Sequence, residues 1–374
     1  MIVRSGDRVM TLMSLQFPNT RLTVDLDAVV ANWRIIGGLA APARIAAVVK
    51  ADGYGLGAVA VATALAGAGC TRFCVAHAEE GMALRAVLPD AVILVLHGLS
   101  AGAAHEYRRH ALLPALATLE QVAEWRLGGG GAAALHVDTG MNRLGLTAIE
   151  AARLADDPAL LAGIDVKLVM SHLACSEDAA HPKNREQLAL FNRLRGRLPR
   201  AAASMANSGG IFLGADFCFD LVRPGIALYG IDPRPDNAAN LVQVYELQAK
   251  ILQVRDVDRG MTVGYGADHR IGDPGRIAVI PVGYADGYLR ALSDGGSGYV
   301  GGHRVPVIGR VSMDLLTLDV SAVPPEVAHP GAWVTLMGGP ADVRGVAARA
   351  GTIGYELMAG LGARYRRQYK GGAA

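Results

Sequence analysis

Short apolar runs alternate with amphipathic or alanine-rich stretches from about residue 44 to residue 230. The apolar runs are rich in β-prone residues, and each is too short to form a helix by itself, so they predict buried strands. The stretches between them predict helices. The predicted strands are 45–50, 73–76, 92–98, 112–118, 135–139, 166–172, 202–207 and 221–229, and the clearest predicted helices are 59–68, 79–87, 119–125, 149–155 and 184–198.

Eight strands that alternate with helices indicate an α/β fold. Parallel strands need long crossover connections, which are usually helices, and eight such units close into a (β/α)8 barrel of the TIM type. Segment 23–39 predicts a strand-like lead and a helix that precede the first barrel strand.

The pattern changes after Pro233, where β-prone segments are separated by Gly, Pro and Asp turns and helical spacers are lost until the tail at 341–358. This predicts a second, mostly antiparallel β domain at the C-terminus. The expected parts are an N-terminal tail at 1–21 that can join the second domain, a barrel at 22–238 and a C-terminal β domain at 239–374. The β-prone segments are 242–257, 276–283, 305–311, 315–320 and 333–337.

Composition and charge narrow the class of protein. A chain of 374 residues is long for one core, so two domains are expected. The formal net charge of +2 is too small to indicate a nucleic-acid or membrane partner. No uncharged apolar stretch reaches ~18 residues, and the first twenty residues have no signal-peptide core, so a cytoplasmic protein is expected. The four cysteines have no metal-binding spacing and predict reduced thiols without a metal: Cys70, Cys74, Cys175 and Cys218.

Lys50 ends the first predicted strand and opens a glycine-rich turn at 51–57. Burial disfavours the ammonium form of a lysine, so the pKa of Lys50 should fall and its free amine become available for Schiff-base chemistry. A lysine at a strand end is more often a solvated rim residue, so this interpretation depends on the neighbouring residues.

Other polar residues also follow predicted strands. Active sites of such barrels lie at the carboxyl ends of the strands, so these side chains are expected to converge. The loops at 207–210 and 223–226 are glycine-rich, and their backbone N–H groups can bind a phosphate. A reactive lysine beside a phosphate site indicates pyridoxal phosphate. The converging residues are Lys50, Arg143, His172, Asn207, Ser208 and Arg223.

Nine motifs together resemble the alanine racemase family. They occur in the order of that family and extend over both predicted domains, from about residue 22 to residue 366. The motifs are AVVKADGYGLGA around Lys50, HVDTGMNRLG at 136–145, SHLA at 171–174, NS at 207–208, RPGIALYG at 223–230, VGYGADHRI at 263–271, VGYADGY at 282–288, VSMD at 311–314 and GYE at 354–356.

The resemblance implies an isomerase that interconverts L-alanine and D-alanine and supplies D-alanine for peptidoglycan. Lys50 would hold pyridoxal phosphate as an internal aldimine and act as one base at Cα, and Tyr265 would be the base on the other face. Two bases of unlike pKa suit a racemisation. His172 and Arg223 would assist Tyr265, and Arg223 would leave the pyridine nitrogen unprotonated, because a guanidinium cannot accept a hydrogen bond.

The resemblance also implies a homodimer in which each active site combines the barrel of one subunit with the second domain of its partner. Tyrosines 284 and 355 would narrow the entrance and favour a methyl side chain. The remaining implied roles are cofactor binding by Tyr54, Ser208, Gly225, Ile226 and Tyr355, substrate binding by Arg143 and Met313, and the entrance at Tyr284 and Asp314, with Tyr265, Tyr284, Met313 and Asp314 acting across the dimer interface.

The chain departs from the family pattern at His136, where many relatives carry a carbamylated lysine that steadies the substrate-binding arginine. Here Arg143 is oriented either by His136 or by a bound anion such as chloride, and a histidine satisfied in the core remains the alternative. Three residues of the lysine loop also differ from the commoner ones, which should tune rate or affinity: Asp52, Gly53 and Leu56.

Four other functions remain as alternatives. A racemase of broader specificity, such as one for serine, would share the catalytic residues and differ in pocket size. Amino-acid decarboxylases pair the pyridine nitrogen with a carboxylate, so Arg223 argues against them. A pyridoxal-phosphate carrier would lack the second domain with Tyr265, and a cofactor-free aldolase would show no bound pyridoxal.

Overall fold

The computed structural model describes residues 19–234 and 239–372. These residues form two compact units, which we call the barrel unit (24–234, 239–245, 354–360 and 369–372) and the β unit (19–23, 246–353 and 361–368). Most of the expected N-terminal tail, up to residue 18, lies outside the described residues. Three short segments from the C-terminal part of the chain group with the barrel unit: 239–245, 354–360 and 369–372.

The barrel unit is built on a parallel sheet. Seven strands follow one another in sequence order from β3 to β9, and β10 pairs in parallel with β2. Backbone N–H groups of Asp220 and Arg223 donate to Ala203 and Ala206 (3.1 and 2.9 Å), which joins the segment of β10 to that of β9. The strands are β2 (Arg44–Ile45), β3 (Ala47–Val48), β4 (Arg72–Val75), β5 (Val92–Val95), β6 (Leu112–Leu116), β7 (Gly131–His136), β8 (Ile164–Met170), β9 (Ala202–Ser204) and β10 (Leu221–Val222).

One residue separates β2 from β3, so the two act as one strand and the ring of eight strands closes. This confirms the predicted (β/α)8 barrel. The strands are covered on their outer face and filled on their inner face, so their side chains are apolar on both sides. Fully or almost fully buried members are Phe73, Ile93, Ala115, Leu135 and Val169, each at most 2% exposed.

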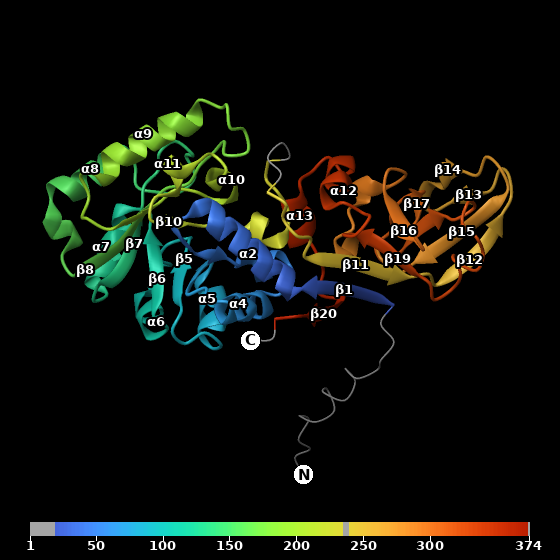
Figure 1. Cartoon of the computed structure of the whole chain (residues 1–374), viewed down its shortest axis with the longest axis horizontal. Coiled ribbons are helices and arrows are strands. Elements are labelled where there is room, and N and C mark those ends of the chain that lie inside the picture. Colours follow the sequence, from blue (N-terminus) through green and yellow to red (C-terminus); the bar gives the residue numbers. More distant parts are fainter. Residues whose placement is uncertain (1–18, 235–238, 373–374) are drawn as a thin grey trace, which may run out of the picture. The chain divides into compact units, whose positions relative to one another are not determined.

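Helices surround these strands, with α8 and α9 on one side and α4, α5 and α6 on another (Figure 1). Several helices begin at a side-chain cap, as at α2, where the Asp25 carboxylate accepts the N–H of Ala28 at 3.0 Å. The helices of this unit are α2 (Leu26–Ala40), α3 (Lys50–Tyr54), α4 (Ala58–Gly67), α5 (Ala78–Arg85), α6 (Ala104–Arg109), α7 (Leu119–Leu127), α8 (Ala148–Asp156), η2 (Pro158–Leu161), α9 (Lys183–Arg195), α10 (Ser208–Ile211), α11 (Ala215–Cys218), η3 (Ile226–Tyr229) and α13 (Gly354–Ala359).

The eighth barrel strand is shorter than predicted. A strand was expected over 221–229, but β10 ends at Val222 and a 3-10 turn occupies 226–229. Pro224 has no N–H for a strand ladder, and the next N–H groups are accepted by the hydroxyl of Ser208. The chain therefore leaves the sheet and turns toward the end of the barrel.

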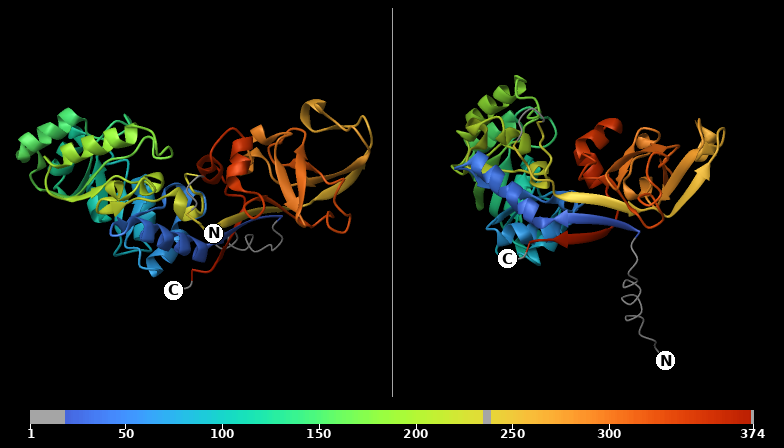
Figure 2. Two further views of the ribbon diagram at one scale, coloured as in Figure 1. Left: turned by 45° about the horizontal axis from the view of Figure 1, so that its top comes forward. Right: turned by 45° about the vertical axis from the view of Figure 1, so that its right-hand side comes forward.

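The β unit contains a nine-stranded sheet in the order β12-β15-β18-β17-β16-β19-β11-β1-β20. The pairings from β12 to β11 are antiparallel, which confirms the predicted β domain. Figure 2 shows β11, β1 and β20 alongside one another. The elements are β1 (Thr20–Asp25), β11 (Tyr245–Lys250), β12 (Gln253–Val257), β13 (Thr262–Val263), η4 (Tyr265–Ala267), β14 (His269–Arg270), β15 (Gly275–Ile280), η5 (Tyr284–Asp286), η6 (Arg290–Leu292), β16 (Ser297–Val300), β17 (His303–Ile308), β18 (Leu316–Asp319), β19 (Trp333–Met337), α12 (Val343–Arg349) and β20 (Arg366–Lys370).

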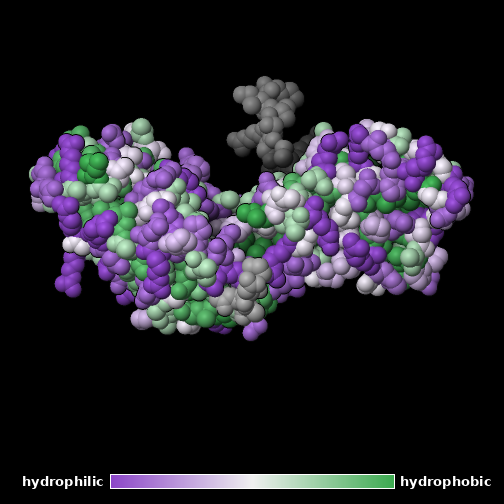
Figure 3. Space-filling view, turned by 90° about the horizontal axis from the view of Figure 1, so that it is seen from above, coloured by the Kyte–Doolittle hydropathy of each residue, from purple (hydrophilic) through white to green (hydrophobic). Residues whose placement is uncertain are grey.

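Polar and charged residues cover most of the face drawn in Figure 3, and apolar residues appear there only in small groups. Within the described part of the chain, no helix combines the length and the apolar character needed to cross a membrane. The four cysteines are free thiols.

Candidate active site

A cavity of about 700 Å³ lies at the carboxyl ends of the barrel strands, and every residue that lines it belongs to the barrel unit. Side chains reach it from the segments that follow successive strands, as expected for this fold. The structure therefore brings together eleven of the residues singled out in the sequence: Lys50, Tyr54, His136, Arg143, His172, Asn207, Ser208, Arg223, Gly225, Ile226 and Tyr355.

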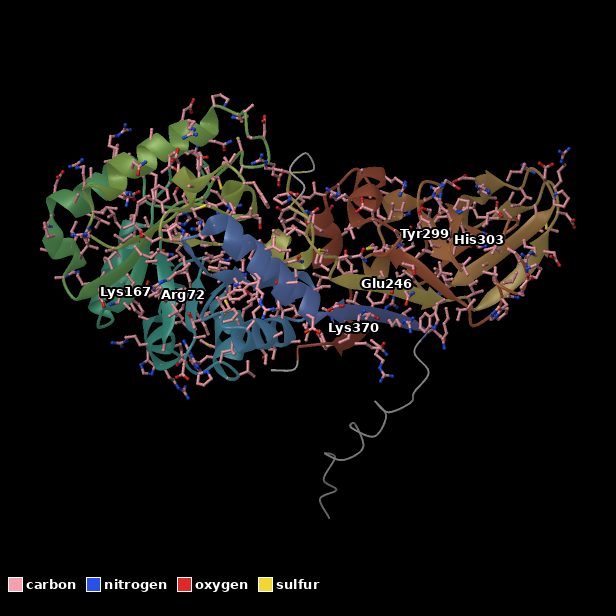
Figure 4. All side chains as sticks on the ribbon, in the orientation of Figure 1. Arg72, Lys167, Glu246, Tyr299, His303 and Lys370 are labelled. Carbon is pink, nitrogen blue, oxygen red and sulfur yellow. The ribbon has the colours of Figure 1, made fainter. Side chains whose placement is uncertain are left out.

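A larger cavity of about 1130 Å³ occupies the opposite, amino ends of the strands. Arg72 and Lys167 line it and are labelled on the barrel unit in Figure 4. None of the predicted site residues lines this cavity. Because barrels of this type place their chemistry at the carboxyl ends of the strands, we assign the chemistry to the smaller cavity.

Lys50 lies two residues after the end of β3 and opens a turn in which Ala51, Asp52 and Tyr54 all have positive φ angles of 51–56°. Burial lowers the pKa of the Lys50 amine, and the nearby Arg143 guanidinium lowers it further. The Glu80 carboxylate acts in the opposite direction. The amine is thus easier to deprotonate than an ordinary lysine, as a nucleophile or a base requires.

Arg223 is buried, with 3% of its surface exposed. Its guanidinium donates to the Ser204 hydroxyl and to the Ser171 carbonyl oxygen (2.6 Å for the latter). Burial lowers the pKa of Arg223 to about 10, which still leaves it protonated at neutral pH. A cation that can only donate is therefore fixed at the floor of the cavity.

His172 lies beside this cation, with its Nδ1 atom 3.5 Å from the Arg223 guanidinium. Burial, and then the charge of Arg223, holds the pKa of His172 well below its ordinary value. The imidazole is neutral, and because Nδ1 faces a donor, its proton resides on Nε2. The side chain of Gln187 donates to the His172 carbonyl oxygen at 2.9 Å and fixes this position.

The start of α10 and the loop after β10 form one polar corner of the cavity. Ser208 Oγ accepts the N–H groups of Gly225 and Ala227 at 2.9 and 3.3 Å. Both bonds occupy the oxygen as an acceptor, so the hydroxyl proton is available to a further group. The Asn207 side chain caps α10 by accepting the N–H of Gly210 at 2.8 Å, which fixes the position of Ser208.

Two tyrosines complete this corner. The ring of Tyr54 lies 6.4 Å from that of Tyr355, and a Cβ atom at Gly225 would lie only 2.2 Å from the Tyr54 hydroxyl. Glycine at 225 is thus required for this close approach. Burial raises the pKa of both phenols, which keeps them neutral donors. Neutral hydroxyl and N–H donors without a carboxylate suit a phosphate group.

Arg143 is exposed at the rim of the cavity. Among the residues that the structure describes, no side chain forms a hydrogen bond with its guanidinium. The loop that carries it is fixed by Asp138. This carboxylate accepts three backbone N–H groups at 2.9–3.0 Å, those of Gly140, Met141 and Asn142.

His136 lies at the end of β7 and is 8% exposed. Burial, and then the Arg223 charge, lowers its pKa to about 4, so it is neutral at pH 7. Among the described residues its Nδ1 atom has no hydrogen-bond partner, and no hydrogen bond joins it to Arg143. The support of Arg143 by His136 or by an anion stays a prediction.

The other predicted site residues lie in the β unit. Tyr265 is 71% exposed, and Tyr284 and Met313 are also exposed, at 43% and 53%. The N–H of Tyr284 donates to the Ser312 carbonyl oxygen at 3.0 Å, so the loop of Tyr284 lies against the loop of Met313.

Arg364 fastens these two loops further. It binds both oxygens of the buried Asp286 carboxylate at 2.6 and 2.8 Å and reaches Asp314 at 2.6 Å. Asp286 in turn accepts the N–H of Gly283 at 3.0 Å. A bidentate arginine of this kind fixes geometry as well as charge.

Three supporting residues were missed by the sequence analysis: Glu80, Asp138 and Arg364. Glu80 accepts the N–H of Ala51 beside Lys50. A local signal existed for Asp138, because an aspartate before a turn that contains glycine commonly binds the following N–H groups. The bond of Glu80 to Ala51 and the bonds of Arg364 join segments far apart in the sequence, so they leave no local pattern.

Comparison with known proteins agrees with this geometry over most of the chain. Residues 24–233 match the family described as "Alanine racemase, N-terminal domain", and residues 244–369 match "Alanine racemase, C-terminal domain". A protein named alanine racemase from Rhodospirillum rubrum is 49% identical over 357 residues, which cover 94% of this chain and 96% of the relative. A protein named alanine racemase from Brucella ovis is 47% identical over 367 residues, which cover 93% of this chain and 93% of the relative.

Solved structures agree as well. The crystal structure of alanine racemase from Bartonella henselae with covalently bound pyridoxal phosphate matches with a TM-score of 0.90 and 40% identity, covering 94% of this chain and 99% of that one. The biosynthetic alanine racemase from Pseudomonas aeruginosa matches with a TM-score of 0.87 and 35% identity, covering 95% of this chain and 100% of that one.

Proposed function

The chain belongs to the alanine racemase family, and from this premise we propose how its own residues interconvert L-alanine and D-alanine. The protein is a pyridoxal-phosphate-dependent isomerase, as the sequence motifs predicted. The observation that carries the assignment of roles is the cavity in which the Lys50 amine, the polar corner around Ser208 and the Arg223 guanidinium meet.

The residues present fit the cofactor. Tyr54, Ser208, Tyr355 and the backbone of Ile226 would supply donors for its phosphate, Gly225 leaves room for the Tyr54 hydroxyl beside them, and Lys50 would supply the amine for covalent attachment. When bound to alanine, the cofactor withdraws electrons from Cα and makes its C–H bond more acidic.

Arg223 would hold the pyridine nitrogen of the bound cofactor and would limit this withdrawal. As a cation that only donates, it cannot keep that nitrogen protonated in the way that a carboxylate would. Weaker withdrawal of electrons from Cα would disfavour two side reactions, decarboxylation and transamination. Proton transfer at Cα would then remain the main reaction.

Two bases act on opposite faces of Cα. Lys50 takes or returns the proton on one face, and its lowered pKa supports this role. The Tyr265 hydroxyl does the same on the other face. A phenol needs assistance to act as a base near neutral pH, and neutral His172, fixed by the cationic Arg223, supplies it through the proton on Nε2.

Tyr265 acts in the active site of a partner subunit. In the single chain the Tyr265 side chain is 71% exposed. Tyr284 and Met313 are also exposed. A base that works at the substrate must be shielded from bulk water, and a homodimer with shared active sites would cover these residues.

Substrate selection follows from the same residues. Arg143 binds the alanine carboxylate, with help from the backbone of Met313. The tyrosines at 284 and 355, together with Asp314, narrow the entrance and favour the methyl group of alanine. We assign the protein to the cytoplasm and to supply of D-alanine for peptidoglycan; its likeness to the biosynthetic enzyme of Pseudomonas aeruginosa supports this role.

The activity is tested by incubating the holoenzyme with L-alanine or L-serine and separating the products by chiral chromatography. We expect fast formation of D-alanine and little D-serine. Absence of D-alanine would overturn the function, and equal rates would overturn the narrow entrance.

The two bases are tested by solvent deuterium exchange. Tyr265→Phe should still exchange the α-proton of one enantiomer, because Lys50 serves its own face, while interconversion is lost. Exchange of both enantiomers at wild-type rates would exclude Tyr265 as a base.

The shared site is tested by mixing two inactive proteins, Lys50→Ala and Tyr265→Ala. Random exchange of subunits gives one intact site in half of the dimers, so about one quarter of wild-type activity should return. No recovery after demonstrated subunit exchange would place both residues in the site of one chain.

A further inference from the structure

The turn that follows Lys50 has a left-handed backbone. Ala51, Asp52 and Gly53 have φ angles of 53°, 51° and 63° with ψ angles of 50°, 48° and 42°, and Tyr54 follows with φ 56°. Three of these four residues carry a Cβ atom, which makes this conformation unfavourable for them. The turn directs both Lys50 and Tyr54 into the same cavity, so other contacts must hold it.

One carboxylate holds the Lys50 side of this turn. Glu80 Oε1 accepts the N–H of Ala51 at 2.6 Å, while Oε2 accepts the N–H groups of Ala76 and His77 at 2.7 and 3.2 Å. Ala76 follows β4, the strand next to that of Lys50. Glu80 thus fastens the strained turn to the end of the neighbouring strand by charge-assisted hydrogen bonds, which are stronger than neutral ones.

The far side of the turn has its own supports. The Asp52 carboxylate accepts the N–H of Ala58 at 2.9 Å, and the N–H of Gly57 donates to the Asp52 carbonyl oxygen at 2.8 Å. These contacts fix the turn to α4 but do not reach the residue beside Lys50. Among the residues that the structure describes, Glu80 is the side chain that binds the Ala51 N–H.

We propose that Glu80 is a positioning residue for the cofactor lysine: it holds the left-handed turn, and so the Lys50 amine, in the geometry needed for covalent attachment of pyridoxal phosphate. This rests on the proposed role of Lys50. Its negative charge also raises the pKa of Lys50 and partly offsets the effects of burial and Arg143. Cys74 also raises the pKa of Lys50, and the charge of Lys50 in turn lowers the pKa of the neighbouring His97 and His172.

The experiment uses the full chain, loaded with pyridoxal phosphate, stripped, and then titrated with the cofactor. Glu80→Gln keeps the side-chain length but loses the charge and one of the two acceptor oxygens. Its affinity for pyridoxal phosphate should fall about five- to ten-fold, since hydrogen bonds to a charged acceptor are lost. The pH midpoint of covalent attachment can be followed by visible absorbance. It should shift to lower pH, because the Glu80 charge that raises the pKa of Lys50 is removed.

Glu79→Gln is the matched control. Glu79 is exposed on the same helix and undergoes the same change of charge, so it should leave both readouts at wild-type values. Equal affinity and an equal pH midpoint in the two variants would overturn the proposal.

Two further measurements separate the remaining outcomes. If Glu80→Gln does not fold, hydrogen exchange of the Ala51 amide in the wild-type protein decides: slow exchange supports the bond to Glu80, and fast exchange overturns it. Lys50→Ala tests the premise by itself, because covalent cofactor in that variant would refute the role of Lys50 rather than that of Glu80.

Discussion

Replacing Gly225 by alanine should expel the Tyr54 hydroxyl from the phosphate corner. The added Cβ atom would lie 2.2 Å from that hydroxyl oxygen and 2.9 Å from the carbon that carries it. Contacts below 3.0 Å do not occur, so the hydroxyl has to retreat by at least about 0.8 Å. Tyr229 packs against the same ring at 4.8 Å and limits the available space.

The magnitude follows from the bond that is lost. A hydrogen bond from Tyr54 to a charged phosphate contributes about 1.5–3 kcal/mol, so affinity for pyridoxal phosphate should fall roughly 10- to 150-fold. The added methyl group also overpacks the space around Tyr54, which should lower the free energy of unfolding by about 1–3 kcal/mol.

Titration of the stripped protein with pyridoxal phosphate and urea unfolding measure the two effects. Gly38→Ala is the control, because no atom lies within 4 Å of a Cβ there and the residue is on an exposed helical position. Tyr54→Phe should lose the same hydrogen bond, and the double variant with Gly225→Ala should lose little more affinity. Wild-type affinity in Gly225→Ala, or two fully additive losses, would refute this explanation.

Three other changes test other parts of the site. Since the pKa of His136 is about 4 in the fold against an ordinary 6.5, only the unfolded chain gains its proton as the pH falls between these values. The stripped protein should therefore lose on the order of 3 kcal/mol of unfolding free energy over that window, and urea unfolding of His136→Asn should lack this component. Arg364→Met should raise the KM for alanine about ten-fold with less effect on kcat, because the entrance loops lose their common partner; the exposed Arg304→Met is the control, and equal kinetics would contradict the role. Ser208→Ala leaves two buried N–H groups without an acceptor and should cost about 2–4 kcal/mol in urea unfolding, so unchanged stability would argue against these bonds.

Much of the fold followed from local patterns. The short apolar runs before Lys50 and before His172 predicted barrel strands because buried parallel strands are apolar on both faces. Loss of helical spacers after Pro233 predicted the antiparallel sheet. The strand predicted over 221–229 was too long, since its end is decided by the Ser208 hydroxyl, which is distant in the sequence.

By itself the sequence indicated the cofactor, through a lysine at a strand end beside glycine-rich phosphate loops, and the resemblance of nine motifs to one family implied the reaction. Tertiary structure alone decided how these groups are held. Tyr355 joins the barrel although it lies more than a hundred residues beyond it in the sequence, and Glu80 reaches the turn of Lys50 from another helix. Such supports are set by distances in space, which depend on packing of the whole barrel and leave no periodic signal along the chain.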